Sequence, residues 1–570
     1  MNGNKALILL LVLLASLLAC GVLKHISYPL LWNDEAECIM HGKRVLEFGY
    51  PKVHDGKNTI YPMRLSEKNI ALDEKTDAYI GIGWSMFYYS TLGLLLAENV
   101  DDIYTKTALL RLPFAILGII GLVIFAMAFL PFINGTRQKL LFLIMYCTLC
   151  LLSVSLLLHI REARYYSLVI FLGASSIYLY LNATFTKKLA YKKYFLAHTT
   201  VLFLLFNTHV PVFFIVLAYL GLYEGIQFFV RNTKQHLDSL EINYSNPYQI
   251  VLSNFRHSSK IILPLVVSLV LIIPLLIFFD TFHISSVTTK FYRYNMTVYF
   301  EHLSSTLNYF VQYEFLIMAF ILKVSSFFLN RKVGKIKNRE LMKKLRVSNF
   351  MSGLFVFYII IISSFPSYIF TRYIVLLLPV LCIIISLEAL VIVDLLSLLE
   401  REIQANAKGL AIAILCPLFV INSISGLTEL KGRAYEIFTQ YKGPLDYIIP
   451  FIKSNYTNTE NLVIAANYEE CAYMYYLNSK VTFGFILNNL EEDRKITPDI
   501  IIYRKDWNWN YEADMFKPFF KQATYQKIAF PVYDYPTNTI PDLQMDYRHL
   551  YRTKYAQNKN QEVKLHYRVQ

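Results

Sequence analysis

Long apolar runs, separated by short polar segments, dominate the first three quarters of the chain. A run of about 20 apolar residues is long enough to cross the hydrocarbon core of a bilayer as a helix. This criterion predicts about eleven transmembrane helices, at 6–23, 109–131, 139–159, 165–181, 194–209, 211–229, 261–279, 306–329, 349–364, 373–394 and 409–424. Since 55% of the 570 residues are hydrophobic, the pattern indicates an α-helical polytopic membrane protein.

One further apolar segment, 79–97 ("YIGIGWSMFYYSTLGLLLA"), is ambiguous. Lysine and arginine accumulate in cytoplasmic loops, and two basic clusters lie at 187–193 and 331–346. Both clusters are cytoplasmic if the N-terminus is cytoplasmic and 79–97 does not cross the membrane. We therefore expect this segment to lie along the membrane surface or to dip in and out, which suits its aromatic residues.

The N-terminal sequence "MNGNKALILLLVLLASLLACG" is compatible with a signal peptide, or with a lipoprotein signal cleaved at Cys20. Because many apolar runs follow it, we expect an uncleaved anchor with a cytoplasmic N-terminus. The predicted location is the cell (inner) membrane. The weak lipoprotein motif and the lack of a retention signal favour a bacterial source.

This topology exports three regions to the far side of the membrane: a first loop of about 24–106, a loop of about 280–305, and a tail from about 425. The sequence therefore predicts two domains, a transmembrane domain at 1–424 and an exported domain at 425–570.

The tail has the pattern of a small α/β domain. "NLVIAANY" (461–468) and "DIIIYRKDW" (499–507) are typical of buried strands. "PLDYIIPFIKSN" (444–455) and "YEECAYMYYLNS" (468–479) are typical of helices. A strand, a helix and a second strand in this order favour a parallel α/β arrangement.

Neither the net charge nor the cysteines indicate a particular function. The net charge of +14 is explained by cytoplasmic loops that hold the topology, so no nucleic-acid partner is expected. Cys147 and Cys150 form a CxxC inside an apolar run, where cysteine acts as a small hydrophobic residue. Cys38 and Cys471 both fall in exported regions, but nothing in the sequence argues that they pair.

Charged residues that face the exported side are the candidates for chemistry. Asp34 and Glu35 follow the first predicted span in "LWNDEAECIMHGKRV". One explanation is a polar turn that begins a helix, because "NDEAE" places acids in a first helical turn.

A second cluster lies in the short turn "LLLHIREARYYSL", which holds Arg161, Glu162, Arg164 and Tyr165. Arg372, in "SYIFTRYIVLLLP", lies at the exported mouth of a later span. Interfacial snorkelling is one explanation of these arginines, but positive charge on the exported side opposes the rule that sets the topology. Arginine is well suited to hold phosphate, and a nearby carboxylate can act as a general base.

At these positions the sequence resembles the GT-C class of membrane glycosyltransferases, in particular the protein mannosyltransferases and the aminoarabinose transferases. The resembling motifs are "W-x-DEA" at 32–36, "LLRLPFAILGII" at 109–120, "EARYYSL" at 162–168 and "TRYIVLLLP" at 371–379. Their order and spacing agree with the class over about 400 residues. One stretch departs from it: "IGIGWSMFYY" stands where relatives carry a His-Pro-Pro-type sequence, so the acceptor stays open.

The resemblance implies that a sugar moves from a polyprenyl-phosphate carrier to a lipid, glycan or protein acceptor. Asp34 is implied as the general base, with Glu35 in support. Arg164 and Arg372 are implied to hold the leaving phosphate, helped by Arg161, while Glu162 and Tyr165 complete the binding set. The single base implies inversion at the anomeric carbon. No resident cofactor and no compelling metal site is expected, although Asp34 and Glu35 are able to bind a divalent cation.

Three other functions compete with this hypothesis. A transporter or flippase of lipid-linked sugars would carry charges in broken helices at mid-membrane, whereas the charges here lie at the ends of spans. A polysaccharide polymerase or ligase would use a large central exported loop. A non-catalytic scaffold leaves the acidic pair unexplained.

Overall fold

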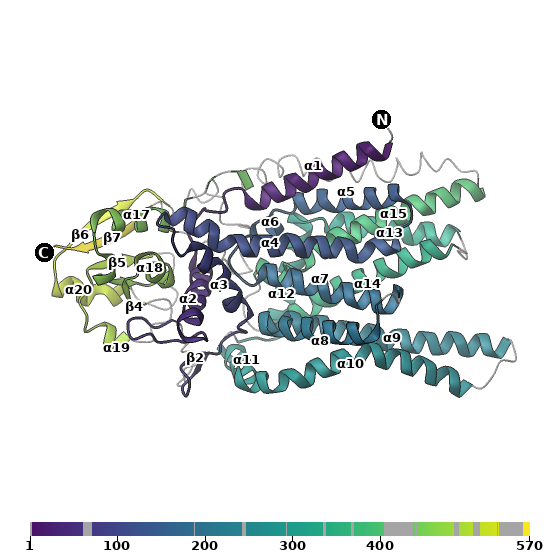
Figure 1. Ribbon diagram of the computed structural model, residues 1–570, viewed down its shortest axis with the longest axis horizontal. Helices are drawn as coiled ribbons and strands as arrows, with labels where there is room; N and C mark the ends of the chain where they lie inside the picture. The colour runs from purple at the N-terminus through teal and green to yellow at the C-terminus, as the bar shows by residue number, and fades with distance from the viewer. Residues whose placement is uncertain are drawn as a thin grey trace.

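Apolar helices build one long bundle, and a small sheet domain lies at one of its ends (Figure 1). The structure is a computed structural model. It describes residues 3–60, 71–186, 189–241, 247–291, 293–333, 338–365, 370–403, 437–438, 440, 442–483, 490–504, 513–532, 534 and 562–569.

The bundle follows most of the predicted apolar runs. Its helices are α1 (Gly3–Leu23), α4 (Ile103–Phe129), α5 (Thr136–Leu152), α6 (Val154–His159), α7 (Tyr166–Leu181), α8 (Tyr191–Thr208), α9 (Val210–Glu241), α10 (Pro247–Phe278), α11 (Thr281–Phe291), α12 (Met296–Tyr313), α13 (Leu316–Val333), α14 (Arg339–Ile362) and α15 (Leu377–Ile403). Within the described residues, seven helices are long and apolar enough to span a membrane, or eight if one bent pair is a single span. The predicted polytopic helical class is confirmed, whereas the number eleven stays a prediction.

Two predicted spans differ from the structure, and a third cannot be compared. The helix expected at 139–159 breaks at Ser153 into α5 and α6. The helix expected at 306–329 is divided between α12 and α13, which meet at an angle of 88°. Hydropathy measures apolar length and not the direction of the chain, so it could not reveal either break. The span predicted at 409–424 lies outside the described residues.

Close helix packing sets the position of the turn between α6 and α7. A Cβ atom added at Gly118 of α4 would lie 2.7 Å from Cβ of Ile160, and one at Gly121 would lie 2.9 Å from the backbone nitrogen of Phe171. Small residues allow this close approach in membrane helices, where packing is the main source of helix association. The turn at 160–165 is therefore held directly against α4.

The first loop contributes two helices that lie across the end of the bundle. In Figure 1, α2 (Asn33–Phe48) and α3 (Ser85–Ala97) stand between the bundle and the sheet domain. A two-stranded sheet, β1 (Leu72–Asp73) and β2 (Ala78–Tyr79), lies between them in sequence. At 13 residues, α3 is too short to cross a bilayer. The expectation that 79–97 does not span agrees with this length.

The tail forms the predicted small α/β domain. A five-stranded sheet has the order β4-β3-β5-β7-β6, in which β3, β4 and β5 are parallel and β7 is antiparallel to its neighbours. The elements are α17 (Leu445–Asn455), β3 (Val463–Ala466), α18 (Glu470–Leu477), β4 (Lys480–Phe483), α19 (Leu490–Asp493), β5 (Ile500–Tyr503), α20 (Lys517–Gln522), β6 (Tyr525–Phe530) and β7 (Val563–Arg568). The buried apolar strands at the centre of the sheet explain why hydropathy found β3 and β5.

Candidate active site

The acidic residues after the first span lie in the first two turns of α2, and their spacing along the helix determines which neighbour each one faces. Asp34, Glu35 and Glu37 are all buried. Successive helix residues are rotated by about 100°, so residues three apart share a face and neighbours do not. Asp34 and Glu37 accordingly face one arginine, whereas Glu35 faces another.

Asp34 lies between two arginines that come from distant parts of the chain. Its Oδ2 is 3.5 Å from Nη2 of Arg164 and 3.6 Å from Nη1 of Arg372. Arg164 also donates a hydrogen bond of 3.1 Å to the backbone oxygen of Asp34. All three residues are buried, so solvent screens their charges only weakly. The structure thus brings together the predicted base and both predicted phosphate-binding arginines.

Aromatic rings surround the guanidinium group of Arg372. Its Cζ lies 3.9 Å from the ring centroid of Phe370, 5.6 Å from that of Tyr373 and 5.7 Å from that of Trp32. These distances allow cation–π attraction, which is stronger away from water. The rings therefore hold the arginine in place and leave it charged.

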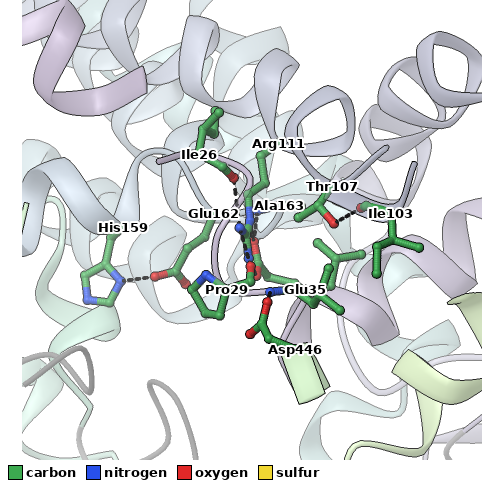
Figure 2. A network of polar contacts seen from close by, with 12 residues as sticks. Ile26, Pro29, Glu35, Ile103, Thr107, Arg111, His159, Glu162, Ala163 and Asp446 are labelled. Carbon is green, nitrogen blue, oxygen red and sulfur yellow. Dashed lines mark hydrogen bonds and ion pairs between the residues drawn. The ribbon is translucent and has the colours of Figure 1, made fainter. Parts of the chain in front are cut away.

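Glu35 makes a different set of contacts (Figure 2). Arg111 of α4 donates two hydrogen bonds to its carboxylate, of 2.8 Å from Nε and 2.5 Å from Nη2. The backbone nitrogen of Ala163 donates a third, of 2.8 Å. Glu35 is fully buried, and this two-point pairing suits a planar guanidinium group. Its carboxylate is occupied by holding α2, α4 and the turn at 160–165 together.

The remaining predicted site residues lie at the edge of this arrangement. Arg161 donates a 2.7 Å hydrogen bond to the backbone oxygen of Lys24, at the end of α1. Glu162 lies 3.4 Å from Nδ1 of His159 and is almost fully buried. The ring of Tyr165 lies beside the guanidinium group of Arg164, at 5.7 Å. Tyr165 therefore contacts the pair formed by Asp34 and Arg164.

Sequence reasoning missed Glu37. Its Oε2 lies 3.6 Å from Nη1 of Arg164, and its Oε1 lies 3.9 Å from Nε2 of His41. Burial raises the pKa of Glu37 to about 7, while Arg164 opposes the shift and Asp34 adds to it. The signal available in the sequence was its position three residues after Asp34 on the helix predicted from "NDEAE".

The described residues contain no group of three or more His, Cys, Asp or Glu side chains arranged to hold a metal ion. Asp34 and Glu35 also pair with different arginines. A divalent cation held jointly by these two carboxylates is therefore not supported by the geometry.

No protein-family model matches the chain, and no curated protein matches it in sequence. Several solved structures are similar to it, among them the following two. The first is ArnT from Cupriavidus metallidurans bound to undecaprenyl phosphate, with a TM-score of 0.49, 11% identity, and coverage of 99% of this chain and 98% of that chain. The second is the Archaeoglobus fulgidus oligosaccharyltransferase in its apo form, with a TM-score of 0.43, 11% identity, and coverage of 92% and 69%. At 11% identity, both similarities concern the fold alone.

Breaking the buried ion pair between Glu35 and Arg111 should lower the thermal stability of the protein strongly. Glu35→Gln leaves the buried Arg111 charge without its counter-ion, which typically costs about 3–5 kcal/mol. We expect a clear fall in the apparent Tm of the detergent-solubilised protein. The matched control is Glu47→Gln on the same helix, because Glu47 is exposed and its contacts with Lys43 and Arg44 are long, at 3.9 and 3.8 Å. Arg44 keeps its closer partner Asp55 in this variant, and an exposed pair contributes about 0–1 kcal/mol. Equal Tm values for the two variants would contradict this account of Glu35.

Proposed function

We propose that this protein is a membrane glycosyltransferase that moves a sugar from a polyprenyl-phosphate carrier to an acceptor hydroxyl, with Asp34 as the general base. The observation that carries the proposal is a buried carboxylate at 3.5 and 3.6 Å from two arginines. These residues fall in the motifs at 32–36, 162–168 and 371–379 that resemble the GT-C class. A base and an anion-binding pair at one place are what a phosphate leaving group and a hydroxyl nucleophile require.

Buried hydrogen-bond donors beside the arginines support an anionic ligand. Within the described part of the chain, Nε1 of Trp32, Nε of Arg164 and the hydroxyl of Tyr166 have no hydrogen-bond partner. Trp32 lies against Arg372, and Tyr166 lies close enough to interact electrostatically with both arginines. Buried polar groups are nearly always paired in folded proteins. A phosphate would supply the acceptors that these donors lack.

The reaction proceeds in one displacement. Asp34 accepts the proton of the acceptor hydroxyl as that oxygen attacks the anomeric carbon. The bond from the anomeric carbon to the phosphate oxygen breaks on the opposite face, and polyprenyl phosphate leaves with the bonding electrons. Arg164 and Arg372 stabilise the charge that develops on the phosphate. One base and no covalent intermediate give inversion of configuration.

The carboxylates of α2 divide their roles in this mechanism. Glu35 holds the scaffold through Arg111, so Asp34 is the carboxylate left to take the proton. Glu37 shares Arg164 with Asp34 and therefore competes with the phosphate for that guanidinium group. The lipid, glycan or protein nature of the acceptor is left to experiment.

The proposed setting is a bacterial inner membrane, with the active site on the exported side. In Figure 1 the N-terminus lies at the end of the bundle away from the C-terminal domain. A cytoplasmic N-terminus, as the basic clusters predict, then places α2 and the sheet domain outside the cell membrane. A polyprenyl-phosphate sugar would reach the site from the outer leaflet.

The general base is tested by Asp34→Asn. Asparagine keeps the shape of the side chain but cannot accept the proton, so the turnover number should fall by about 10²–10⁴. The assay is transfer from a polyprenyl-phosphate sugar in vesicles, after each variant is shown to insert and fold. Asp101→Asn, at an exposed position of the same loop, should retain wild-type turnover. Near-normal turnover in Asp34→Asn would show that the base lies elsewhere, with Glu37 and Glu162 the next candidates.

Donor affinity should depend on pH through Glu37. Its pKa of about 7 means that the carboxyl group is ionised above pH 7, where it competes with phosphate for Arg164, and protonated below pH 7. The donor KM should therefore fall as the pH is lowered from 8 to 6. The change approaches tenfold for each unit by which bound phosphate raises the pKa of Glu37.

The matched variant for this measurement is Glu37→Gln, which resembles the protonated form. Its donor KM should be low and nearly constant over the same range of pH. A wild-type KM that does not change with pH, or a variant that keeps the wild-type dependence, would remove Glu37 from the donor site.

The orientation is tested by labelling of introduced cysteines in intact cells. A membrane-impermeant maleimide should label Ser454→Cys, at an exposed position of α17. Glu340→Cys, at an exposed position of α14 beside the basic cluster, should react only after permeabilisation. The unsubstituted chain controls for the native cysteines. Labelling of α17 from the cytoplasmic side alone would place the proposed site in the wrong compartment.

A further inference from the structure

The segment that leads into α2 is held by the C-terminal domain through two consecutive backbone groups. The backbone nitrogen of Leu30 donates to Oδ1 of Asp446 at 3.3 Å, and that of Leu31 donates to the hydroxyl of Tyr476 at 3.2 Å. The partners are separated by 416 and 445 residues in sequence. Leu30 and Leu31 are fully buried, so water does not replace these partners and their loss would be costly.

Tyr476 lies in a chain of hydrogen bonds whose direction follows from the donors available. The hydroxyl of Thr107 donates to the backbone oxygen of Ile103 at 2.7 Å, which uses its single proton. The 2.5 Å contact between Thr107 and Tyr476 must then be donated by Tyr476. The backbone N–H of Leu31 thus donates to the Tyr476 hydroxyl, which donates to the Thr107 hydroxyl, which donates to the backbone oxygen of Ile103. One hydroxyl therefore joins the C-terminal domain, the entry to α2 and the first turns of α4.

Asp446 makes a comparable junction at the start of α17. Its Oδ2 accepts a 2.8 Å hydrogen bond from the backbone nitrogen of Gly443, while Oδ1 accepts the one from Leu30. Figure 2 shows this carboxylate close to Pro29, Glu35 and Arg111. Arg111 itself donates to the backbone oxygen of Pro29 at 2.8 Å. The residues just before Leu31 are thus held from the bundle on one side and from the C-terminal domain on the other.

The loop that follows α2 is attached to the same domain. Nδ2 of Asn58 donates to the backbone oxygen of Ser479 at 3.0 Å, and Oδ1 of Asn58 accepts from the backbone nitrogen of Val481 at 2.8 Å. Nζ of Lys57 donates to the backbone oxygen of Asn478 at 2.6 Å. The helix α18 also packs along α2. The domain therefore contacts the chain before, along and after the helix that carries Asp34.

We propose that the C-terminal domain positions the active-site helix, and that Tyr476 and Asp446 are positioning residues for Trp32 and Asp34. This inference rests on the proposed glycosyl transfer. Leu31 precedes Trp32, whose ring lies against Arg372. Asp34 follows two residues after Trp32, in the first turn of α2. A shift of the backbone at Leu30 and Leu31 would move the base relative to the acceptor hydroxyl. Such small displacements at a reacting group lower the turnover number strongly.

The first test is Tyr476→Phe in the full-length protein. It removes the shared hydroxyl and leaves the Leu31 N–H without its acceptor, while the ring remains in α18. We expect the turnover number to fall about tenfold or more, because Asp34 shifts relative to the acceptor hydroxyl. The donor KM should rise by a smaller factor, because Arg164 and Arg372 come from other segments of the chain and only Trp32 moves with Leu31. Tyr475→Phe makes the same chemical change at the neighbouring position and should leave both constants unchanged. A Tyr476→Phe variant with wild-type turnover would overturn the proposal.

The second test separates positioning from general instability and does not depend on the enzymatic assay. Asp446→Asn keeps an acceptor oxygen for Leu30 and should retain most of the activity, whereas Asp446→Ala should lose it. Hydrogen–deuterium exchange of peptides that cover residues 29–37 should increase in Tyr476→Phe and Asp446→Ala, and stay at the wild-type rate in Asp446→Asn. Unchanged exchange in all three variants would overturn the positioning role. Absence of sugar transfer by the wild-type protein would instead overturn the proposed function, and the exchange result would then stand by itself.

Discussion

The buried ion pair between Glu35 and Arg111 is the interaction on which the rest of the site depends. Arg111 donates to the Glu35 carboxylate and to the backbone oxygens of Ile26 and Pro29, while Glu35 also accepts from the backbone of Ala163. One pair therefore ties the segment after α1, the first turn of α2, the helix α4 and the turn before α7. A buried ion pair is tolerated only when its remaining donors and acceptors are also hydrogen-bonded. Here the backbone groups of Ile26, Pro29 and Ala163 supply those hydrogen bonds.

The neighbouring acidic residues of α2 have different partners because they point in different directions around the helix. Glu35 points to α4 and has its oxygens filled, whereas Asp34 and Glu37 point to Arg164. The arginines reach Asp34 from the turn before α7 and from the chain just before α15. Glycines on α4 pack against the first of these places, and Gly173 of α7 packs against Leu376 at the second. A group of charged residues can therefore be buried at the end of an apolar bundle, because each of these arginines pairs with a carboxylate. Aromatic rings also surround Arg372.

The C-terminal domain is hydrogen-bonded to the segment that leads into α2. Its sheet contributes none of the charged groups that contact Asp34 in the described residues, yet Asp446 and Tyr476 bind the backbone four and three residues before it. The central strands of its sheet are buried and apolar. Because both hydrogen bonds are donated by backbone nitrogens, no side-chain motif at Leu30 or Leu31 marks them in the sequence.

The sequence by itself determined the helical membrane class, the α/β nature of the tail, and the candidates Asp34, Arg164 and Arg372, because hydropathy and charge at the ends of apolar runs are local properties. It could not determine the break at Ser153, the 88° bend between α12 and α13, or the separate tasks of Asp34 and Glu35. The spacing placed Glu37 on the same helix face as Asp34 but did not reveal its contact with Arg164, and nothing in the sequence indicated that Tyr476 accepts from Leu31 across 445 residues. These features depend on which surfaces meet in three dimensions, and only the tertiary structure decided that Glu35 meets Arg111 while Asp34, one residue earlier, meets Arg164 and Arg372.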